Sequence, residues 1–205
     1  DRTNGRVTGV ETSQGLVKAN TVISATAGWS STIAKMVDLE LPITTHALQA
    51  MVTEPLKPFL DKTISSANLH AYVYQTDRGE VVIGGGVDPY PTYSQRSTFQ
   101  PTEELAAHTL EMFPCLKNVN VLRQWAGLCD MTPDYSPVMG FTPVEGYLLD
   151  VGWGTYGFKA GPVAGETLAE TIATGRTADL ISPFGIERFT HGDLVGEKGA
   201  AAVGH

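Results

Sequence analysis

One stretch decides how this chain folds, and it reads Tyr147-Leu-Leu-Asp-Val-Gly-Trp-Gly-Thr-Tyr-Gly-Phe-Lys-Ala-Gly-Pro162. Its first residues, up to Gly152, predict a strand, and a glycine-rich loop follows as far as Lys159. The next residues predict a helix from about Gly161 to Thr174, with Gly175 at its C-terminal stop. The expected buried face of that helix consists of Ala164, Leu168 and Thr171 or Ile172.

The glycine loop has a chemical as well as a structural interpretation. Backbone N–H groups and the positive end of the helix dipole suit a phosphate or another electron-rich group. The loop glycines would let the backbone approach a flat ligand, or they would only give the helix clearance against the sheet. Lys159 adds a second positive element, and together they would hold a carboxylate well. The alternative for Lys159 is a solvated surface lysine.

The first part of the chain reads as strands around turns. Arg6 to Thr12 and Gly15 to Asn20 alternate about a polar turn and predict a hairpin. The nearly apolar run Thr21 to Ala25 predicts a strand that is buried on both faces. Ser30 is the expected N-cap of a helix that ends near Val37.

The middle of the chain predicts an antiparallel sheet. Thr44 to Glu54 and Val119 to Leu128 read as strands, and His70 to Gly84 reads as a hairpin turning at Thr76–Gly79. A helix is expected from about Thr102 to Phe113, and Met131 to Gly140 is expected to be a loop. This order indicates a mixed α+β and α/β chain in which one domain interrupts another.

Composition narrows the function. The 205 residues carry a formal net charge of -8 and no Lys/Arg-rich run, so nucleic acid is not an expected partner. No apolar stretch approaches the roughly 20 residues that span a bilayer. Cys115 and Cys129 form no metal or redox motif and are expected to be two buried thiols, which suits a cytoplasmic protein. The chain starts without Met or a signal peptide, so we expect a fragment whose first half is missing, with a frayed end from Gly196 to His205.

Three segments carry a resemblance to a known family. Gly152–Pro162 resembles the final flavin-binding motif of the D-amino-acid-oxidase superfamily of FAD-dependent oxidoreductases. Trp125-Ala-Gly-Leu-Cys-Asp-Met-Thr-Pro-Asp-Tyr-Ser-Pro-Val-Met-Gly140 and Thr21-Val-Ile-Ser-Ala-Thr-Ala-Gly-Trp-Ser30 are similar to two other family segments, in the family's order. The amino-acid sequence of these segments, and that of the Tyr72–Gly85 hairpin, is most similar to the family's heterotetrameric sarcosine oxidase branch.

The resemblance implies the residues of a site. Lys159 would contact the substrate carboxylate, and Tyr72 and Tyr74 lie in the hairpin that would roof the flavin, with plain packing as their alternative. The residues implied for FAD binding are Ala25, Ala27, Gly28, Trp29, Gly127, Gly154, Thr155, Tyr156, Gly157, Phe158 and Lys159.

The sequence also departs from the family pattern. Many amino-acid oxidases have a carboxylate-binding arginine where this chain has Cys129-Asp130, which favours Lys159 as the carboxylate anchor. Cys129 would line the pocket or be a buried structural thiol. Asp134 is interpreted as a turn-former rather than a catalytic base.

Some expected parts are absent from these residues. The G-x-G-x-x-G fingerprint for the FAD pyrophosphate does not occur, and the family places it in the N-terminal half. The histidine that carries covalent FMN also falls upstream by this resemblance. We therefore do not assign it to His46, His70 or His108.

The implied architecture is the C-terminal part of a two-domain flavoprotein. Residues 1–41 and 136–205 would belong to an FAD-binding α/β domain, and residues 42–135 would form a mainly antiparallel substrate domain. The terminal segment would also include a surface tail.

The implied function is oxidation of a secondary or N-methyl amino acid, with sarcosine the favoured substrate, within a hetero-oligomeric oxidase. FAD would be non-covalent, FMN would lie at a subunit interface, and the fragment alone would be inactive. The alternatives are a β-type proline dehydrogenase, a glycine oxidase, or a non-catalytic scaffold that binds no flavin. A metal hydrolase is disfavoured because no H-E-x-x-H or clustered His/Asp set occurs.

Overall fold

The computed structural model describes residues 1–196 and divides them into two compact units. The split unit contains residues 1–44 and 130–196, and the middle unit contains residues 45–129. The chain therefore leaves the split unit once and returns to it. The labels FAD-binding domain and substrate domain remain predictions for these two units.

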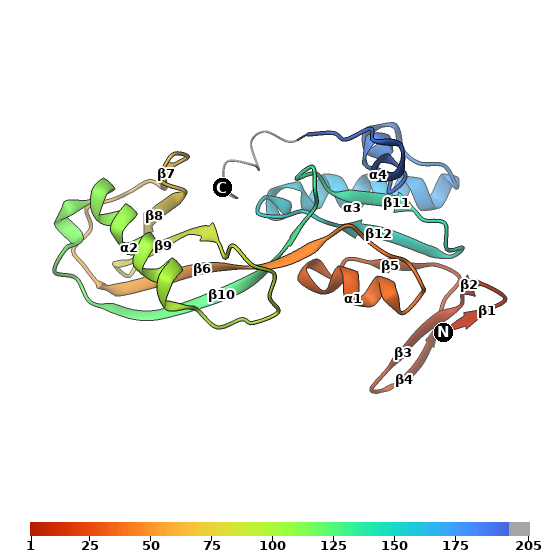
Figure 1. The fold of residues 1–205 in the computed structure, drawn as a ribbon, viewed down its shortest axis with the longest axis horizontal. Helices are drawn as coiled ribbons and strands as arrows, with labels where there is room; N and C mark the ends of the chain where they lie inside the picture. Colours follow the sequence, from red (N-terminus) through yellow and green to blue (C-terminus); the bar gives the residue numbers. More distant parts are fainter. Residues whose placement is uncertain (197–205) are drawn as a thin grey trace. The chain divides into compact units, whose positions relative to one another are not determined.

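The split unit is built on a three-stranded sheet with the order β11-β12-β5 (Figure 1). Strand β12 (Tyr147–Val151) pairs antiparallel with β11 (Val138–Phe141) and parallel with β5 (Val22–Ser24). Two small hairpins precede the sheet: β1 (Arg2–Thr3) with β2 (Arg6–Val7), and β3 (Gly9–Thr12) with β4 (Gly15–Lys18). The predicted hairpin before residue 20 is thus confirmed.

Helices cover both faces of this sheet. One face packs on α1 (Ser30–Lys35) through Ala34, and the other packs on α3 (Gly157–Thr174) through Ala164 and Leu168. Gly175 ends α3 with φ +67°, so the predicted stop is confirmed. The remaining elements are the 3₁₀ turns η1 (Ala27–Trp29) and η3 (Asp179–Phe184) and the short helix α4 (Arg188–His191).

Several boundaries in the split unit differ from the prediction. Helix α3 begins at Gly157 and not near Gly161, because the last residues of the segment that its glycines had indicated as a loop already form the first helical turn. Ser30 is the first residue of α1 and not its N-cap, since the 3₁₀ turn before it already starts the helical path. Its hydroxyl donates to the Ala27 carbonyl at 2.5 Å.

Two strand predictions also need correction. Ile23 in β5 is exposed because β5 is an edge strand of the described sheet and α3 packs on Met139 and Leu148 of the other two strands, so β5 is not buried on both faces. The segment predicted as a loop up to Gly140 contains the start of β11 at Val138. The predicted buried face of α3 is confirmed for Ala164, Leu168 and Thr171, whereas Ile172 is exposed.

The middle unit is a five-stranded sheet with the order β10-β6-β9-β8-β7. The β6–β9, β9–β8 and β8–β7 pairs are antiparallel, and the hairpin between β8 and β9 turns where the sequence predicted it. The strands are β6 (Thr44–Pro55), β7 (Ile64–Ser66), β8 (Ala71–Gln75), β9 (Glu80–Val87) and β10 (Val121–Met131).

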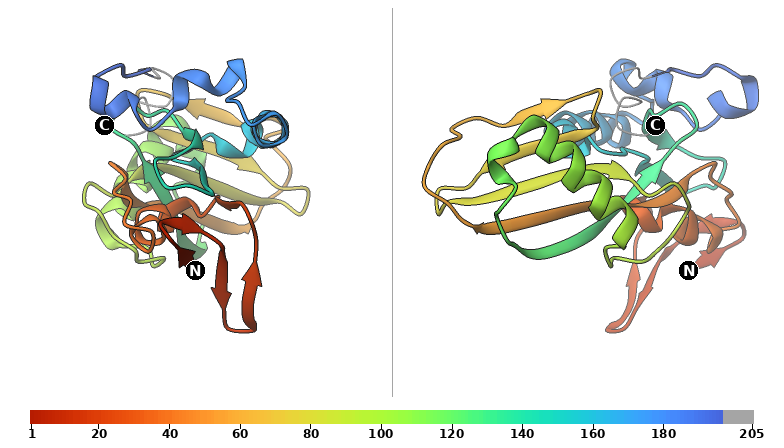
Figure 2. Two further views of the ribbon diagram at one scale, coloured as in Figure 1. Left: turned by 90° about the vertical axis from the view of Figure 1, so that its right-hand side faces the viewer. Right: turned by 60° about the vertical axis from the view of Figure 1, so that its left-hand side comes forward.

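One helix, α2 (Phe99–Met112), lies across one face of this sheet, as Figure 2 shows. Leu105 packs there with Val73, Val81 and Ile83 in the core of the unit. The 3₁₀ turn η2 (Pro114–Leu116) follows α2 and adds Leu116 to the same core. The helix starts earlier than predicted because Pro101 fits in the first turn, where an N–H is not needed. The mixed α/β fold expected from the sequence is confirmed.

The cysteines and the chain end complete the fold. Cys129 is buried as predicted, but Cys115 is exposed because Leu116 is the residue of the short turn η2 that packs into the core, and neither cysteine is in a disulfide. The predicted frayed end lies outside the described residues except for Gly196. No helix within residues 1–196 combines the length and the apolar character that crossing a bilayer requires.

Candidate functional site

Three predicted segments meet at one edge of the three-stranded sheet. Strands β5 and β12 are parallel, so the loops that follow them, at residues 25–29 and 152–156, leave the sheet at the same edge. Strand β11 is antiparallel to β12, with Val138 opposite Val151, so residues 130–137 lead into the sheet at that edge as well. The carboxyl end of parallel strands is where ligands bind in open α/β sheets.

The N-terminus of helix α3 opens at this edge. The first N–H groups of a helix have no partner within it, and no side chain caps the start of α3 at Tyr156. Lys159 lies in the first helical turn and is exposed, as is Phe158. Helix dipole and ammonium group therefore contribute positive charge at the same end of the helix.

The glycines of this region fall into two groups. A Cβ on Gly152, which has φ +75°, would lie 2.6 Å from the Thr132 side chain, so this glycine is required for packing. Gly157 is equally confined by Trp153. In contrast, a Cβ on Gly161 or Gly165 would meet no atom within 4 Å. Helix α3 therefore has no side chain at Gly161 and Gly165, which leaves room for a flat group to approach the helix backbone there.

Asp130 fixes the loop at its start, and sequence reasoning did not assign it this role. Its carboxylate accepts the Gly152 N–H at 2.5 Å, and its backbone carbonyl accepts the Gly154 N–H at 3.1 Å. Burial raises the pKa of Asp130, and the N–H groups of Gly152 and its neighbours oppose this without cancelling it. Asp130, which follows Cys129 at the end of strand β10, thus holds the shape of the glycine loop.

We expect Asp130→Ala to lower the free energy of unfolding by about 1–3 kcal/mol, because the buried Gly152 N–H loses its acceptor. Asp130→Asn keeps an oxygen at the same place and is expected to lose less. Denaturant unfolding of both variants checks this. Equal losses for the two would show that the hydrogen bond to Gly152 is not the reason.

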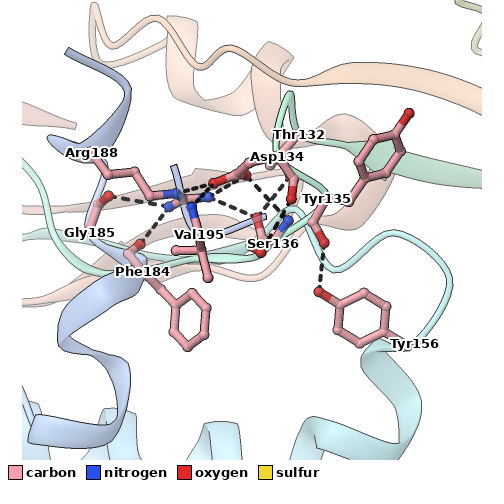
Figure 3. Close-up of polar contacts among 9 residues, drawn as sticks. All are labelled: Thr132, Asp134, Tyr135, Ser136, Tyr156, Phe184, Gly185, Arg188 and Val195. Carbon is pink, nitrogen blue, oxygen red and sulfur yellow. Dashed lines mark hydrogen bonds and ion pairs between the residues drawn. The ribbon is translucent and has the colours of Figure 1, made fainter. Parts of the chain in front are cut away.

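A buried ion pair lies beside the same loop (Figure 3). Asp134 and Arg188 meet through two hydrogen bonds of 2.7 and 3.0 Å, and their side chains are 1% and 3% exposed. Asp134 also accepts the Ser136 N–H at 3.3 Å, which confirms its interpretation as a turn-former. Burial would raise the pKa of Asp134, but the hydrogen bonds and charge of Arg188 outweigh it and the pKa lies below its ordinary value.

The partner Arg188 was not predicted. The tail was expected to pack across the surface, yet Arg188 is buried 54 residues away from Asp134 in the sequence. No local pattern marks it, because Glu187-Arg188 reads as an ordinary solvated charge pair. A buried acidic side chain in the Thr132-Pro-Asp-Tyr-Ser136 turn was the available signal, since such a group needs a cation.

The segment after β5 has the small, exposed backbone that the resemblance implied. Ala25 and Ala27 are exposed, Gly28 is buried, and Trp29 is partly exposed in the 3₁₀ turn. Ala27 has φ +46°, an uncommon conformation for a residue other than glycine. These residues lie at the sheet edge from which the glycine loop leaves.

The two predicted tyrosines lie in the middle unit on strand β8. Tyr72 and Tyr74 point to the same side and stack, with ring centroids 6.5 Å apart and planes inclined by 15°. Burial, and then the neighbouring Tyr74, raise the pKa of Tyr72. Their side of the sheet is opposite to the one that α2 covers, because the intervening Val73 packs under that helix.

Gly84 on strand β9 makes room for Tyr72. The two residues are paired across the strands, and a Cβ on Gly84 would lie 2.3 Å from the Tyr72 hydroxyl oxygen and 2.4 Å from the ring. The Tyr72 ring therefore lies flat over this glycine. Gly127 on strand β10 has open space around its Cβ position instead.

We expect Gly84→Ala to destabilise the middle unit by about 1–3 kcal/mol, because the Tyr72 ring would have to move. Denaturant unfolding measures the loss, with Gly127→Ala as the matched control for a glycine in open space. If Gly84→Ala unfolds like the wild type, Tyr72 does not lie over this position.

The histidines that were left unassigned do not form a cluster. His46 Nδ1 lies 2.8 Å from the Asp88 carbonyl oxygen, His70 Nδ1 is buried, and His108 lies on α2.

The predicted site residues are divided between the two units. The structure brings together the predicted residues 25–29 and 154–159 in the split unit. Tyr72, Tyr74 and Gly127 belong to the middle unit.

Loops that meet at the carboxyl end of parallel strands, beside a helix start without a side-chain cap, are an arrangement that cofactor-binding α/β proteins share. Comparison with known families gives the class of this protein. The family model "FAD dependent oxidoreductase" matches residues 1–171, and the chain belongs to this family. Arg188 lies beyond the matched residues.

Named relatives narrow the comparison. The chain is 44% identical to "Sarcosine oxidase subunit beta" of Rhodobacter capsulatus over 98% of its length and 48% of the relative's. The protein of the same name from an Arthrobacter species is 44% identical, with 98% and 49% covered. The chain thus spans about half the length of these curated relatives.

Solved structures agree on the fold. L-proline dehydrogenase from P. horikoshii superposes with a TM-score of 0.82 at 33% identity, covering 94% of this chain and 53% of that one. Glycine oxidase from Geobacillus kaustophilus gives a TM-score of 0.78 at 20% identity, with 90% and 50% covered. The second likeness concerns the fold alone.

Proposed function

We propose that this chain supplies part of the flavin site and the carboxylate anchor of an oxidase for secondary or N-methyl amino acids, with sarcosine the favoured substrate. The observation that carries the proposal is the convergence of residues 25–29, 130–137 and 152–159 at one sheet edge. The 44% identity to two sarcosine oxidase β subunits supports the choice of substrate.

The split unit fits FAD by its shape and its donors. The helix start offers uncapped N–H groups, and Gly161 and Gly165 leave the helix face clear. Small residues line the neighbouring segment at Ala25 and Ala27. The proposed flavin contacts are Ala25, Ala27, Gly28, Trp29, Gly127, Gly154, Thr155, Tyr156, Gly157, Phe158 and Lys159. When bound non-covalently, FAD would supply the redox chemistry as the acceptor of a hydride, that is, of two electrons and one proton, from the substrate C–H bond.

The chain's own residues hold the substrate and stabilise charge. The Lys159 ammonium group pairs with the substrate carboxylate, which fixes the C–H bond next to the nitrogen. The start of α3 stabilises negative charge that develops at the cofactor edge. In this proposal, Tyr72 and Tyr74 present their stacked rings to the substrate. Cys129 lines the substrate pocket and does not act as a nucleophile. Water then hydrolyses the imine that the substrate becomes.

The parent protein is proposed to work with other subunits. The relatives are named as subunits, which supports a hetero-oligomeric enzyme. We place this enzyme in the cytoplasm as part of the proposal. FMN at a subunit interface, attached through residues outside this chain, would receive electrons from FAD.

The test compares substrates in the natural polypeptide that contains this chain, purified with its co-encoded subunits. We expect kcat/KM to be highest for sarcosine among sarcosine, L-proline and glycine. A preference for proline would favour the β-type proline dehydrogenase alternative, which the 33% identity to the P. horikoshii enzyme supports. A preference for glycine would favour a glycine oxidase. No bound flavin and no turnover would leave the non-catalytic scaffold.

A further inference from the structure

The buried Arg188 uses all of its hydrogen-bonding capacity, in part on the two residues that flank Tyr135. Its guanidinium has five N–H donors. They bond the two Asp134 oxygens, the Ser136 carbonyl at 2.9 Å, and the Phe184 and Gly185 carbonyls at 3.0 and 3.2 Å. A single side chain from the tail thus binds the Asp134 carboxylate before Tyr135 and the Ser136 backbone carbonyl after it.

Tyr135 is held in a conformation that it would not favour alone. Its φ is +55°, in the left-handed region that costs a residue with a Cβ some free energy. The grip of Arg188 on Asp134 and Ser136 maintains this conformation, and Thr132 adds a hydrogen bond of 2.8 Å to the same Ser136 carbonyl. Such strain persists only where the surroundings enforce it.

The held carbonyl of Tyr135 reaches the glycine loop. It accepts a hydrogen bond of 2.8 Å from the Tyr156 hydroxyl, and Tyr156 is the N-cap residue that immediately precedes α3 (Figure 3). The Tyr156 ring also packs edge-on against Trp153, with ring centroids 6.0 Å apart. Trp153 in turn donates to the Asp150 carboxylate at 2.7 Å.

We propose that Arg188 is a positioning residue for the glycine loop, acting from the tail through Asp134, the Tyr135 carbonyl and the Tyr156 hydroxyl. The family model ends at residue 171, so Arg188 lies beyond the part of the chain that the model covers, whereas Asp134, Tyr135 and Tyr156 lie within it. Its relevance to FAD rests on the proposed function, but the coupling itself does not.

The test uses the FAD-loaded natural polypeptide and two mild variants. Tyr156→Phe removes only the hydroxyl that bonds the Tyr135 carbonyl. Arg188→Lys removes the planar guanidinium that bonds Asp134 and Ser136, the residues on either side of Tyr135. We expect amide hydrogen exchange in residues 152–158 to rise about fivefold in each, the gain from losing about one hydrogen bond. The Kd for FAD is expected to rise by a similar factor, with a changed visible spectrum of the bound flavin.

A double-mutant cycle separates coupling from general loosening. If Arg188 acts through Tyr156, Tyr156→Phe will change exchange much less in the Arg188→Lys background. Arg176→Lys, an exposed arginine just after α3, is the matched control and should change neither quantity. Should Arg188→Lys fail to fold, Tyr156→Phe alone decides.

Two results would overturn the proposal. In the first, both variants lower Tm but leave the amide exchange of the loop unchanged. In the second, the effects of the two variants on exchange simply add in the double mutant. These outcomes are distinct from a failure of the proposed function. A wild-type protein that binds no FAD would refute the flavin site, and the exchange data would still show whether the tail controls the loop.

Discussion

Replacing Lys159 by Met is expected to reduce kcat/KM for sarcosine by roughly 30- to 150-fold, the equivalent of about 2–3 kcal/mol. The side chains are similar in length, so Met removes the charge and its hydrogen bonds while it keeps the bulk. Lys159 lies in the first turn of α3 and is exposed, so the substitution should leave the fold intact. Steady-state kinetics of the reconstituted enzyme, with Tm as the check on folding, measures the effect.

Lys18→Met provides the matched control. Lys18 is an exposed lysine in the hairpin of the same unit, and its loss should change kcat/KM by less than a factor of about two. If the two variants behave alike, Lys159 does not bind the carboxylate. If Lys159→Met instead abolishes flavin binding, Lys159 contributes mainly to the cofactor site.

Removing the buried cation is expected to have the largest effect on stability. Arg188→Met should lower the free energy of unfolding by about 3–5 kcal/mol, because it leaves the Asp134 carboxylate buried and uncompensated. The carbonyls of Phe184, Gly185 and Ser136 lose donors at the same time. Denaturant unfolding at neutral pH measures the loss, and Arg176→Met, at an exposed position, should change stability by no more than about 0.5 kcal/mol.

The pH dependence of this loss identifies its cause. The pKa of Asp134 is lowered in the folded protein, so its contribution is present above the ordinary carboxyl pKa of about 4. It is lost as the pH falls through the folded-state value, since protonation removes the charge that Arg188 neutralises. The stability gap between wild type and Arg188→Met should therefore narrow below about pH 4. A gap that is constant from neutral to acid would show that packing, not the ion pair, sets the loss.

The sequence predicted the order of the elements because their signals are local. The alternation in residues 70–84 predicts a hairpin, and the glycine at 175 predicts a helix stop; both are confirmed. The errors arise where distant residues decide. Ile23 looks like the centre of a buried strand, but its exposure depends on where α3 packs. The glycines predict a loop as far as Lys159, while the helical turn that starts at Gly157 depends on the loop that Asp130 holds.

The candidate site was predictable in its composition but not in its construction. The glycine loop, Lys159 and the Ala25–Trp29 segment follow from motifs that lie in short runs. The supports of the loop do not, because each joins residues far apart in the sequence: Asp130 with Gly152, and Asp134 with Arg188. The clearance of Tyr72 over Gly84 likewise depends on the pairing of two strands.

The most direct test of the flavin assignment is an anaerobic absorption spectrum of the natural polypeptide with its subunits, before and after sarcosine is added. We predict that sarcosine bleaches the oxidised-flavin band of the wild type within the time of turnover and that Lys159→Met slows this bleaching strongly. A bound flavin that stays oxidised with sarcosine, or a purified protein without flavin, would contradict the assignment.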